Sequence, residues 1–254
     1  MILRPIETAA ASSNEFVSVW EAIQRTQTQR YKECWLITQP SHAVLAGELA
    51  AKVSSPQLPK LDDHLLRAIA MHDAGWGVPD ARAIVRSRAT PQHRPESFIE
   101  VPVAQFLEAW EESIAAAQSI SPAGGYIVSR HFCRIAEPCA KSGKEAGQVQ
   151  QFLDRESQRQ KKLVPKQSYE TKELELLTDL LQFCDLLSLY ICCGAQEKVV
   201  FSEYFGGSAR LTPKETGLKL DPPLIVAGSQ FSVAALRHPA TKELSNQQIA
   251  VKIV

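Results

Sequence analysis

The stretch Ala70-Met71-His72-Asp73-Ala74-Gly75-Trp76-Gly77 ends a run of residues with the apolar spacing of a helix. His72 lies one or two helical turns after three apolar residues of that run, Leu65, Ala68 and Ile69. Its side chain is therefore expected on the apolar face, and the same spacing applies to Asp73. A carboxylate on an apolar face is costly unless it is paired or bound to a metal. The doublet thus indicates a buried polar site.

Two more residues of these types lie in similar surroundings. His42 ends the segment Gln-Pro-Ser-His (39–42), at the start of an Ala/Leu-rich helix pattern. Asp185 lies in Leu-Leu-Gln-Phe-Cys-Asp-Leu-Leu (180–187), with no lysine or arginine within one helical turn. A divalent ion held by His42, His72, Asp73 and Asp185 would supply the missing counter-charge. Nitrogen and oxygen ligands of this kind admit Fe, Mn, Ni, Co or Zn. Taken singly, each residue is more often a hydrogen-bonded core residue.

The pattern of apolar residues predicts a mainly α fold in a single domain, residues 1–254. We expect a helical core over about residues 13–196 and a C-terminal, β-containing appendage over about 197–254. Helices are predicted from near Asn14, over 41–53 with Ser41 as the cap, over 62–75, from Pro102, from Ser121, and over 143–163 and 171–193. A strand is predicted at 34–38, and residues 1–3 could pair with the C-terminal strands. Residues 76–102 are interpreted as a long loop with at most a helical turn.

Composition excludes several classes of function. The 254 residues carry 28 basic and 28 acidic side chains, so no nucleic-acid partner is expected. We find no stretch that approaches the roughly 18–20 apolar residues of a membrane span, and no secretory signal. The six cysteines show neither a disulfide framework nor a Cys-x-x-Cys motif. We therefore expect a reduced, cytoplasmic protein that acts on a small molecule.

In order and type, His42, His72-Asp73 and Asp185 resemble the signature of the HD-domain superfamily, His…His-Asp…Asp. The motifs Gln-Pro-Ser-His, Met-His-Asp-x-Gly-Trp and Gln-x-Cys-Asp-x-Leu-Ser-Leu are similar to those of a bacterial family at the edge of this superfamily. The resemblance covers roughly Trp35 to Cys193. It implies an HD-like helical bundle with a metal site at its centre. It most often implies hydrolysis of phosphoesters, including nucleotides, and a minority of the superfamily are di-iron oxygenases.

The sequence departs from that pattern at one informative position. Many HD hydrolases continue His-Asp-x-Gly-Lys, with a lysine able to meet phosphate, whereas this chain has Trp76. The change puts phosphate binding by this turn in doubt and suggests an apolar or aromatic wall beside the substrate. Asp185 also follows Asp73 at an unusually long distance, with three predicted helices between them, so the order of helices cannot be carried over.

These observations lead to one main hypothesis, a metal-dependent phosphohydrolase acting on a small phosphoester or nucleotide-like substrate. In it, Asp73 both binds the ion and orients water, and His131 protonates the leaving group or holds a second metal. Trp76, Arg130 and Arg94 are candidate substrate contacts. A di-iron oxygenase, which would require His131 as a ligand, is one alternative. A non-catalytic, degenerate HD-fold binding module is the other, and Trp76 in place of lysine favours it.

Overall fold

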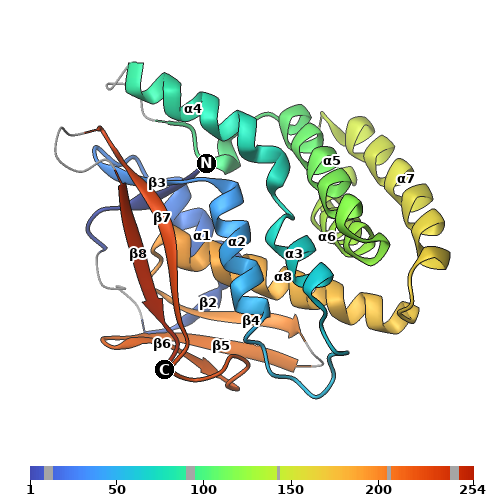
Figure 1. The fold of residues 1–254 in the computed structure, drawn as a ribbon. Coiled ribbons are helices and arrows are strands. Elements are labelled where there is room, and N and C mark those ends of the chain that lie inside the picture. The colour runs from blue at the N-terminus through green and yellow to red at the C-terminus, as the bar shows by residue number, and fades with distance from the viewer. Residues whose placement is uncertain (9–13, 90–94, 142–143, 205–206, 241–245) are drawn as a thin grey trace.

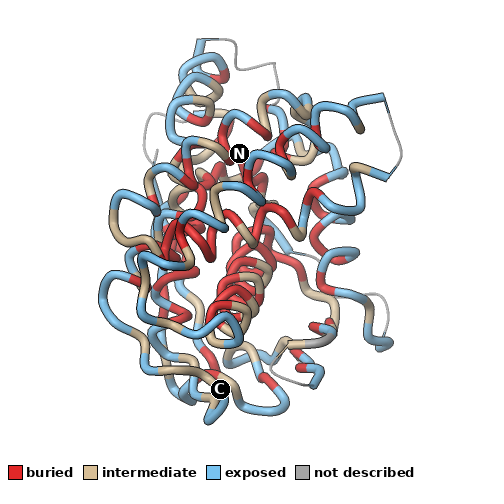
Figure 2. The backbone as a smooth tube through the Cα atoms, turned by 90° about the vertical axis from the view of Figure 1, so that its right-hand side faces the viewer, coloured by how far each residue is buried: buried red, intermediate tan, exposed pale blue. Residues whose placement is uncertain are grey.

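The computed structural model describes residues 1–8, 14–89, 95–141, 144–204, 207–240 and 246–254. Its central element is helix α8 (Thr171–Cys193), which contacts α1 (Val19–Gln27), α2 (Gln39–Ala50) and α6 (Pro122–Ala140). Figure 2 shows buried residues concentrated along the helices at the centre. Gly194, in the left-handed conformation with φ of 70°, ends α8 as expected for a helix C-terminus.

The composition of α8 corrects one expectation. By length and apolar content α8 could cross a membrane, so the statement that no stretch approaches such a span is wrong for this segment. However, 78% of its most apolar 18-residue window is buried inside the fold. An all-round apolar helix that is surrounded by other elements is what the centre of a large core requires.

Helices α5, α6 and α7 lie together on one side of the fold (Figure 1). Helix α5 (Val103–Ile120) packs on α6, α6 packs on α7 (Ala146–Leu163), and α3 (Asp63–Ala70) contacts α2, α5 and α6. Among the described residues there are also three short 3-10 helices, Ala74–Trp76, Phe98–Glu100 and Val164–Lys166. The predicted helices from Pro102 and Ser121 and over 171–193 are confirmed. In these segments the residues that favour a helix start and the helical spacing of the apolar residues indicate the same ranges.

Four local predictions were wrong. Helix α3 ends at Ala70 and not at Gly75, so His72 and Asp73 lie in the turn that follows it. Residues 77–89 form helix α4 (Gly77–Ala89) instead of a loop; α4 is mostly exposed, so apolar spacing gives little sign of it. Phe16–Ser18 is strand β2, and α1 begins only after it, where the Ser18 side chain accepts from the Glu21 amide at 3.1 Å. Helix α2 is capped by Thr38, not Ser41, since the Thr38 hydroxyl accepts from the Ser41 amide.

The described strands form two four-stranded sheets. In one, the order is β1 (Ile2–Pro5), β3 (Cys34–Ile37), β7 (Gln230–His238) and β8 (Asn246–Lys252), all antiparallel. In the other, β2 pairs in parallel with β4 (Lys198–Tyr204), followed by β5 (Gly207–Lys214) and β6 (Gly217–Asp221), both antiparallel. Both sheets therefore combine strands from the two ends of the chain.

The fold is thus mainly helical, with more β structure than a small C-terminal element. Strand β1 reaches the C-terminal strands only through β3, where Leu3 faces Leu36 and Leu36 faces Leu236. One cluster of buried apolar side chains continues from α8 into both sheets; Leu181, Phe201 and Val233 belong to it. The strands consequently cover part of the core that α5, α6 and α7 leave open (Figure 1).

Candidate metal centre

Three segments, two helices and one turn, bring the four predicted ligands together in the core of the fold. His42 lies in the first turn of α2, the His72-Asp73 doublet in the turn after α3, and Asp185 in α8. His42 Nε2 lies 2.8 Å from Asp73 Oδ2, and His72 Nε2 lies 3.2 Å from Asp185 Oδ1. His42 and His72 are fully buried, and the two aspartates are each only 6% exposed. We call these four residues the His/Asp cluster.

The turn that carries the doublet is held against α5. Helix α3 ends at Ala70, and the Gly75 amide donates to Ser113 Oγ at 3.0 Å. A side chain at Gly75 could not be accommodated, because its Cβ would lie 2.1 Å from the carbonyl oxygen of Ala109. The close approach of this backbone to α5 therefore sets where His72 and Asp73 lie.

Neighbouring groups fix the tautomer of both imidazoles. Nδ1 of His72 lies 2.8 Å from the carbonyl oxygen of Ile69, which can only accept. Nδ1 of His42 lies 2.9 Å from Ser188 Oγ, and the Ser188 hydroxyl donates its own proton to the carbonyl of Asp185 at 2.8 Å. Each ring nitrogen Nδ1 must therefore be the donor. In the neutral rings Nε2 then carries the lone pair, directed at the carboxylates.

A lone pair and a carboxylate oxygen at these distances require a proton or a cation between them. In the metal-free cluster the proton is on His72: burial alone would lower the pKa of His72, but Asp73 and Asp185 outweigh it and raise the pKa to about 9. Burial would likewise raise the pKa of Asp185, yet the hydrogen bond and charge of His72 lower it to about 2. The cluster therefore holds positive charge strongly.

The donor set also fits a divalent ion. One ligand atom each from His42, His72 and Asp185 lie within 4.8 Å of one another. Two atoms bound to one Zn-like ion at about 2.1 Å can be at most about 4.2 Å apart. Asp73 Oδ2 lies 2.8 Å from His42 Nε2 and 3.9 Å from His72 Nε2, and His72 Nε2 lies 3.2 Å from Asp185 Oδ1, so these three separations satisfy the limit. Ligand histidines that donate Nδ1–H to an outer partner are common in metal sites.

His131, from α6, lies at the edge of the cluster. Its Nε2 is 3.7 Å from Asp185 Oδ2, and its ring centroid is 5.6 Å from that of His72. The ring is buried, and its Nδ1 has no hydrogen-bond partner among the described residues. Burial lowers the pKa of His131 to about 4, so the imidazole is neutral at neutral pH. It can accept a proton or bind a metal there more readily than it can donate a proton.

A cavity of about 510 Å³ opens beside the cluster. His72, Asp73, His131 and Asp185 line it, whereas His42 lies behind them. The remaining wall is rich in aromatic rings, contributed by Trp20, Trp76, Phe98, Phe106, Trp110 and Phe132. Trp76 therefore lies where the departure from the His-Asp-x-Gly-Lys pattern suggested, at the wall of the space next to the doublet.

Arg130 lies outside this wall. Its guanidinium donates to Glu137 at 2.9 Å and to Glu175 at 3.4 Å, and so is occupied by α6 and α8. The neighbouring Arg134 extends the same contact by binding Glu175, Asp179 and Gln182. This position gives Arg130 a structural contact and does not support the predicted substrate contact. Arg94 lies outside the described residues.

Sequence reasoning missed two polar residues that belong to the site. Ser188 orients His42, and its position three residues after Asp185 on one helix was the available signal. Gln39 lines the cavity and is 3% exposed. Its position three residues before His42, in the segment Gln-Pro-Ser-His, was the available signal.

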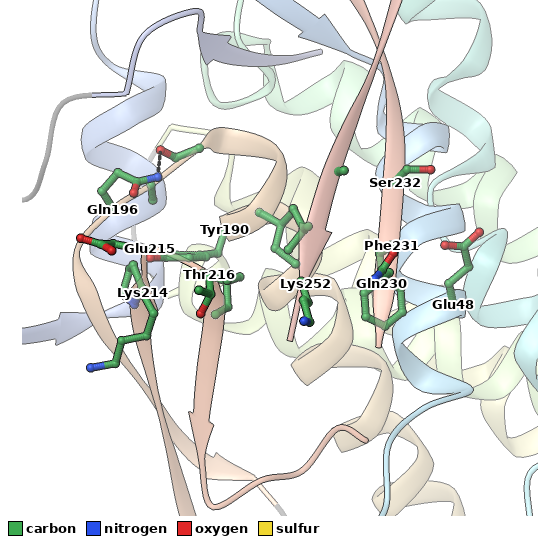
Figure 3. A pocket seen from close by; sticks show the side chains of 18 of the residues that line it. Glu48, Tyr190, Gln196, Lys214, Glu215, Thr216, Gln230, Phe231, Ser232 and Lys252 are labelled. Carbon is green, nitrogen blue, oxygen red and sulfur yellow. Dashed lines mark hydrogen bonds between the residues drawn. The ribbon is translucent and has the colours of Figure 1, made fainter. Parts of the chain in front are cut away.

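A larger groove of about 980 Å³ lies elsewhere (Figure 3). It is bounded by the end of α8 and by strands from both sheets, and includes Glu48, Lys214, Glu215 and Lys252. Its charges are mixed in sign, and no residue of the His/Asp cluster lines it. The smaller, more apolar cavity is therefore the better candidate for chemistry.

The family described as "Protein of unknown function (DUF3891)" matches residues 25–223, well over half of the chain. The chain belongs to this family. The matched range includes all four residues of the cluster and His131. Comparison with curated proteins and with solved structures gave no match.

Proposed function

We propose that this protein is a divalent-metal-dependent hydrolase of small phosphoesters, built on an HD-like helical core. One observation carries the proposal: two imidazoles, whose Nε2 atoms face two carboxylates, meet beside a cavity large enough for a small molecule. The order His, His-Asp, Asp along the chain, which resembles the HD-domain signature, supports the same conclusion.

Each residue has a distinct part in this proposal. His42, His72 and Asp185 would hold the ion together with Asp73, and Ser188 keeps His42 in the binding tautomer. When bound, the ion would supply Lewis-acid polarisation of a phosphoryl oxygen and a more acidic water. Asp73 lines the cavity, where its carboxylate can orient that water. His131, neutral and close to Asp185, suits proton acceptance better than the protonation of a leaving group.

A specific contact favours a second candidate, a di-iron oxygenase. Asp185 directs Oδ1 at His72 and Oδ2 at His131, so its carboxylate lies between two imidazoles. Asp185, His72 and His131 would then be among the residues that hold two iron ions, which would supply the oxygen chemistry. Iron near two per chain together with oxygen consumption would favour this candidate, and a content near one with phosphate release would favour the hydrolase.

The hydrolase is tested with the full chain loaded with Mn²⁺ or Fe²⁺ and a panel of phosphomonoesters and phosphodiesters. Phosphate or alcohol release should fall at least 100-fold in Asp73→Asn and His72→Ala, about the scale expected for lost metal or base chemistry. His64→Ala, at an exposed residue of α3, is the matched control and should retain activity. Release that is equal in all of these variants would refute the assignment. No release and no retained metal would identify a non-catalytic module.

A further inference from the structure

We propose that the groove at the end of α8 is a second binding site, for a small molecule that carries a phosphate or carboxylate group. The groove has a volume of about 980 Å³ and is bounded by the end of α8 and by strands of both sheets (Figure 3). This volume is near the upper end of the range of small-molecule sites, about 300–1,000 Å³. None of the described residues that line the groove belongs to the His/Asp cluster, so the proposal is independent of the proposed hydrolysis.

The groove contains an arginine that has no acidic partner. Arg4, in strand β1, lines the groove and is partly buried. In the described part of the chain its guanidinium has one hydrogen bond, from Nη1 to the carbonyl oxygen of Ile191, and no ion pair. Burial lowers the pKa of Arg4, which is the effect expected where no carboxylate offsets the cost of removing a cation from water. An anion bound in the groove would supply the missing counter-charge.

The end of α8 accounts for only part of this charge. A cation is favoured at a helix C-terminus, which carries about half of a negative charge, and the Ile191 carbonyl belongs to the last turn of α8. The guanidinium also lies against the backbone of Gly194, since a Cβ there would be 3.0 Å from Cζ and Nη1 of Arg4. A guanidinium has five N–H donors, however, and the Ile191 carbonyl accepts from one nitrogen only. Because Arg4 lines the groove, its other donors are available to a ligand there.

Three lysines add to the positive charge of the groove. Lys52, Lys214 and Lys252 line it, are exposed, and form no ion pair with the described residues. The four basic residues of the lining are accompanied by two acidic ones, Glu48 and Glu215. Figure 3 shows these two acids at opposite sides of the groove, with Lys252 between them. The lining therefore keeps an excess of positive charge that both acids together do not cancel.

The chemistry of the lining selects among ligands. The planar fork of a guanidinium matches two oxygens on one phosphorus or carbon atom, so phosphate and carboxylate groups fit Arg4 equally in kind. The side chains of Thr216, Gln230 and Ser232 also line the groove and offer neutral hydrogen-bonding groups to the rest of the molecule. A hydrocarbon or a neutral sugar would leave the guanidinium without a counter-charge, and a cation would be repelled.

The experiment is a calorimetric titration of the EDTA-treated full chain, at constant ionic strength, with inorganic phosphate, with succinate and with ribose. Removal of metal ensures that phosphate cannot bind through an ion at the His/Asp cluster. At least one of the two anions should bind saturably, and ribose should not. Binding of phosphate alone would identify a phosphate site, binding of succinate alone a carboxylate site, and binding of both a site for either oxyanion.

Two variants connect the binding to the groove. Arg4→Gln removes the charge but keeps an N–H that can donate to the Ile191 carbonyl, and it should weaken anion binding at least about tenfold, the factor that one hydrogen bond to a charged group supplies. Lys252→Gln, at an exposed residue, should weaken binding about twofold. Lys161→Gln is the matched control: it removes the same charge from an exposed residue of α7, outside the groove, and should leave the affinity unchanged.

Three results would overturn the proposal: no saturable binding of either anion, an affinity that Arg4→Gln leaves unchanged, or an equal loss in Lys252→Gln and Lys161→Gln. The melting temperature of Arg4→Gln without anion shows whether this variant is folded. If it is not, the comparison of Lys252→Gln with Lys161→Gln decides the question, because both are exposed substitutions of the same kind.

Discussion

Nε2 of His42 lies 2.8 Å from Oδ2 of Asp73, although the two residues are 31 positions apart in the chain. His42 comes from the first turn of α2 and Asp73 from the turn after α3. The contact depends on Ser188 of α8, which accepts the Nδ1 proton of His42 and so leaves Nε2 to face the carboxylate. Three separate elements therefore determine the direction in which His42 Nε2, a candidate metal ligand, points.

Loss of either buried imidazole should abolish metal retention. In His42→Ala and His72→Ala, elemental analysis should find less than about a tenth of the metal that the native protein binds, because each variant removes one of the two imidazole ligands of the proposed four-residue site. Saturating metal should raise the melting temperature of the native chain and not that of the variants, since a ligand at 100 times its Kd stabilises by about 2.7 kcal/mol. His64→Ala should behave as native; equal metal content in all chains would contradict the site.

Ser188→Ala should reduce metal affinity about 10- to 100-fold, the usual effect of losing an outer-shell partner of a ligand histidine. The hydroxyl is buried and is the hydrogen-bond partner of His42 Nδ1, at 2.9 Å. Thr178→Val is the matched control: it removes another buried α8 hydroxyl, which donates only to the Leu174 carbonyl, four residues back. Competition with a chelator measures both affinities, and equal losses would show a general effect on α8.

The stability of the metal-free protein should decline between about pH 6.5 and 9. The folded pKa of His72 is raised to about 9, so its contribution is fully present below the unfolded value near 6.5 and is lost as pH rises through 9. The size should be on the order of 3 kcal/mol. Metal affinity should rise over the same window, because the ion displaces this proton. Urea unfolding at several pH values checks the first trend, and a flat profile would contradict it.

The contribution of Asp185 to folding stability depends on pH in the opposite direction. Because the folded pKa of Asp185 is lowered to about 2, its contribution is present above the unfolded value near 3.8 and is lost as pH falls through 2. The metal-free protein should therefore keep this contribution between about pH 4 and 6.5. Asp185→Asn should remove the loss of stability that the native chain shows as the pH falls below about 4. The urea midpoints of the native and variant chains, measured at several acidic pH values, check this.

Gly75→Ala should destabilise the protein by at least about 1–3 kcal/mol, the usual cost of overpacking. Its Cβ would collide with the backbone carbonyl of Ala109, which cannot move without shifting α5. Gly77→Ala is the control, since nothing lies within 4 Å of its Cβ position. Calorimetry compares the two. Equal melting temperatures would mean that the turn carrying His72 and Asp73 is not held against α5 as described.

Much of the helical core could be predicted because local chemistry and pattern agree there. Asp62 and Ser121 cap their helices through their own side chains, and α8 has the apolar content of a core helix. Helix α4 could not be found in this way, because Val78 and Val85 are exposed and its position depends on neighbouring elements. Strand β2 was also missed, since it is stabilised by pairing with β4, far along the chain.

The sequence by itself determined which residues would be unstable in an apolar core without a partner: His42, His72, Asp73 and Asp185. That follows from side-chain chemistry and helical period, which are local properties. Tertiary structure alone decided that Ser188 orients His42, that Arg130 reaches Glu175 of α8, and that aromatic rings from several helices enclose one cavity. The physical reason is that hydrogen-bond direction and cavity shape depend on how separate elements pack, which no single segment specifies.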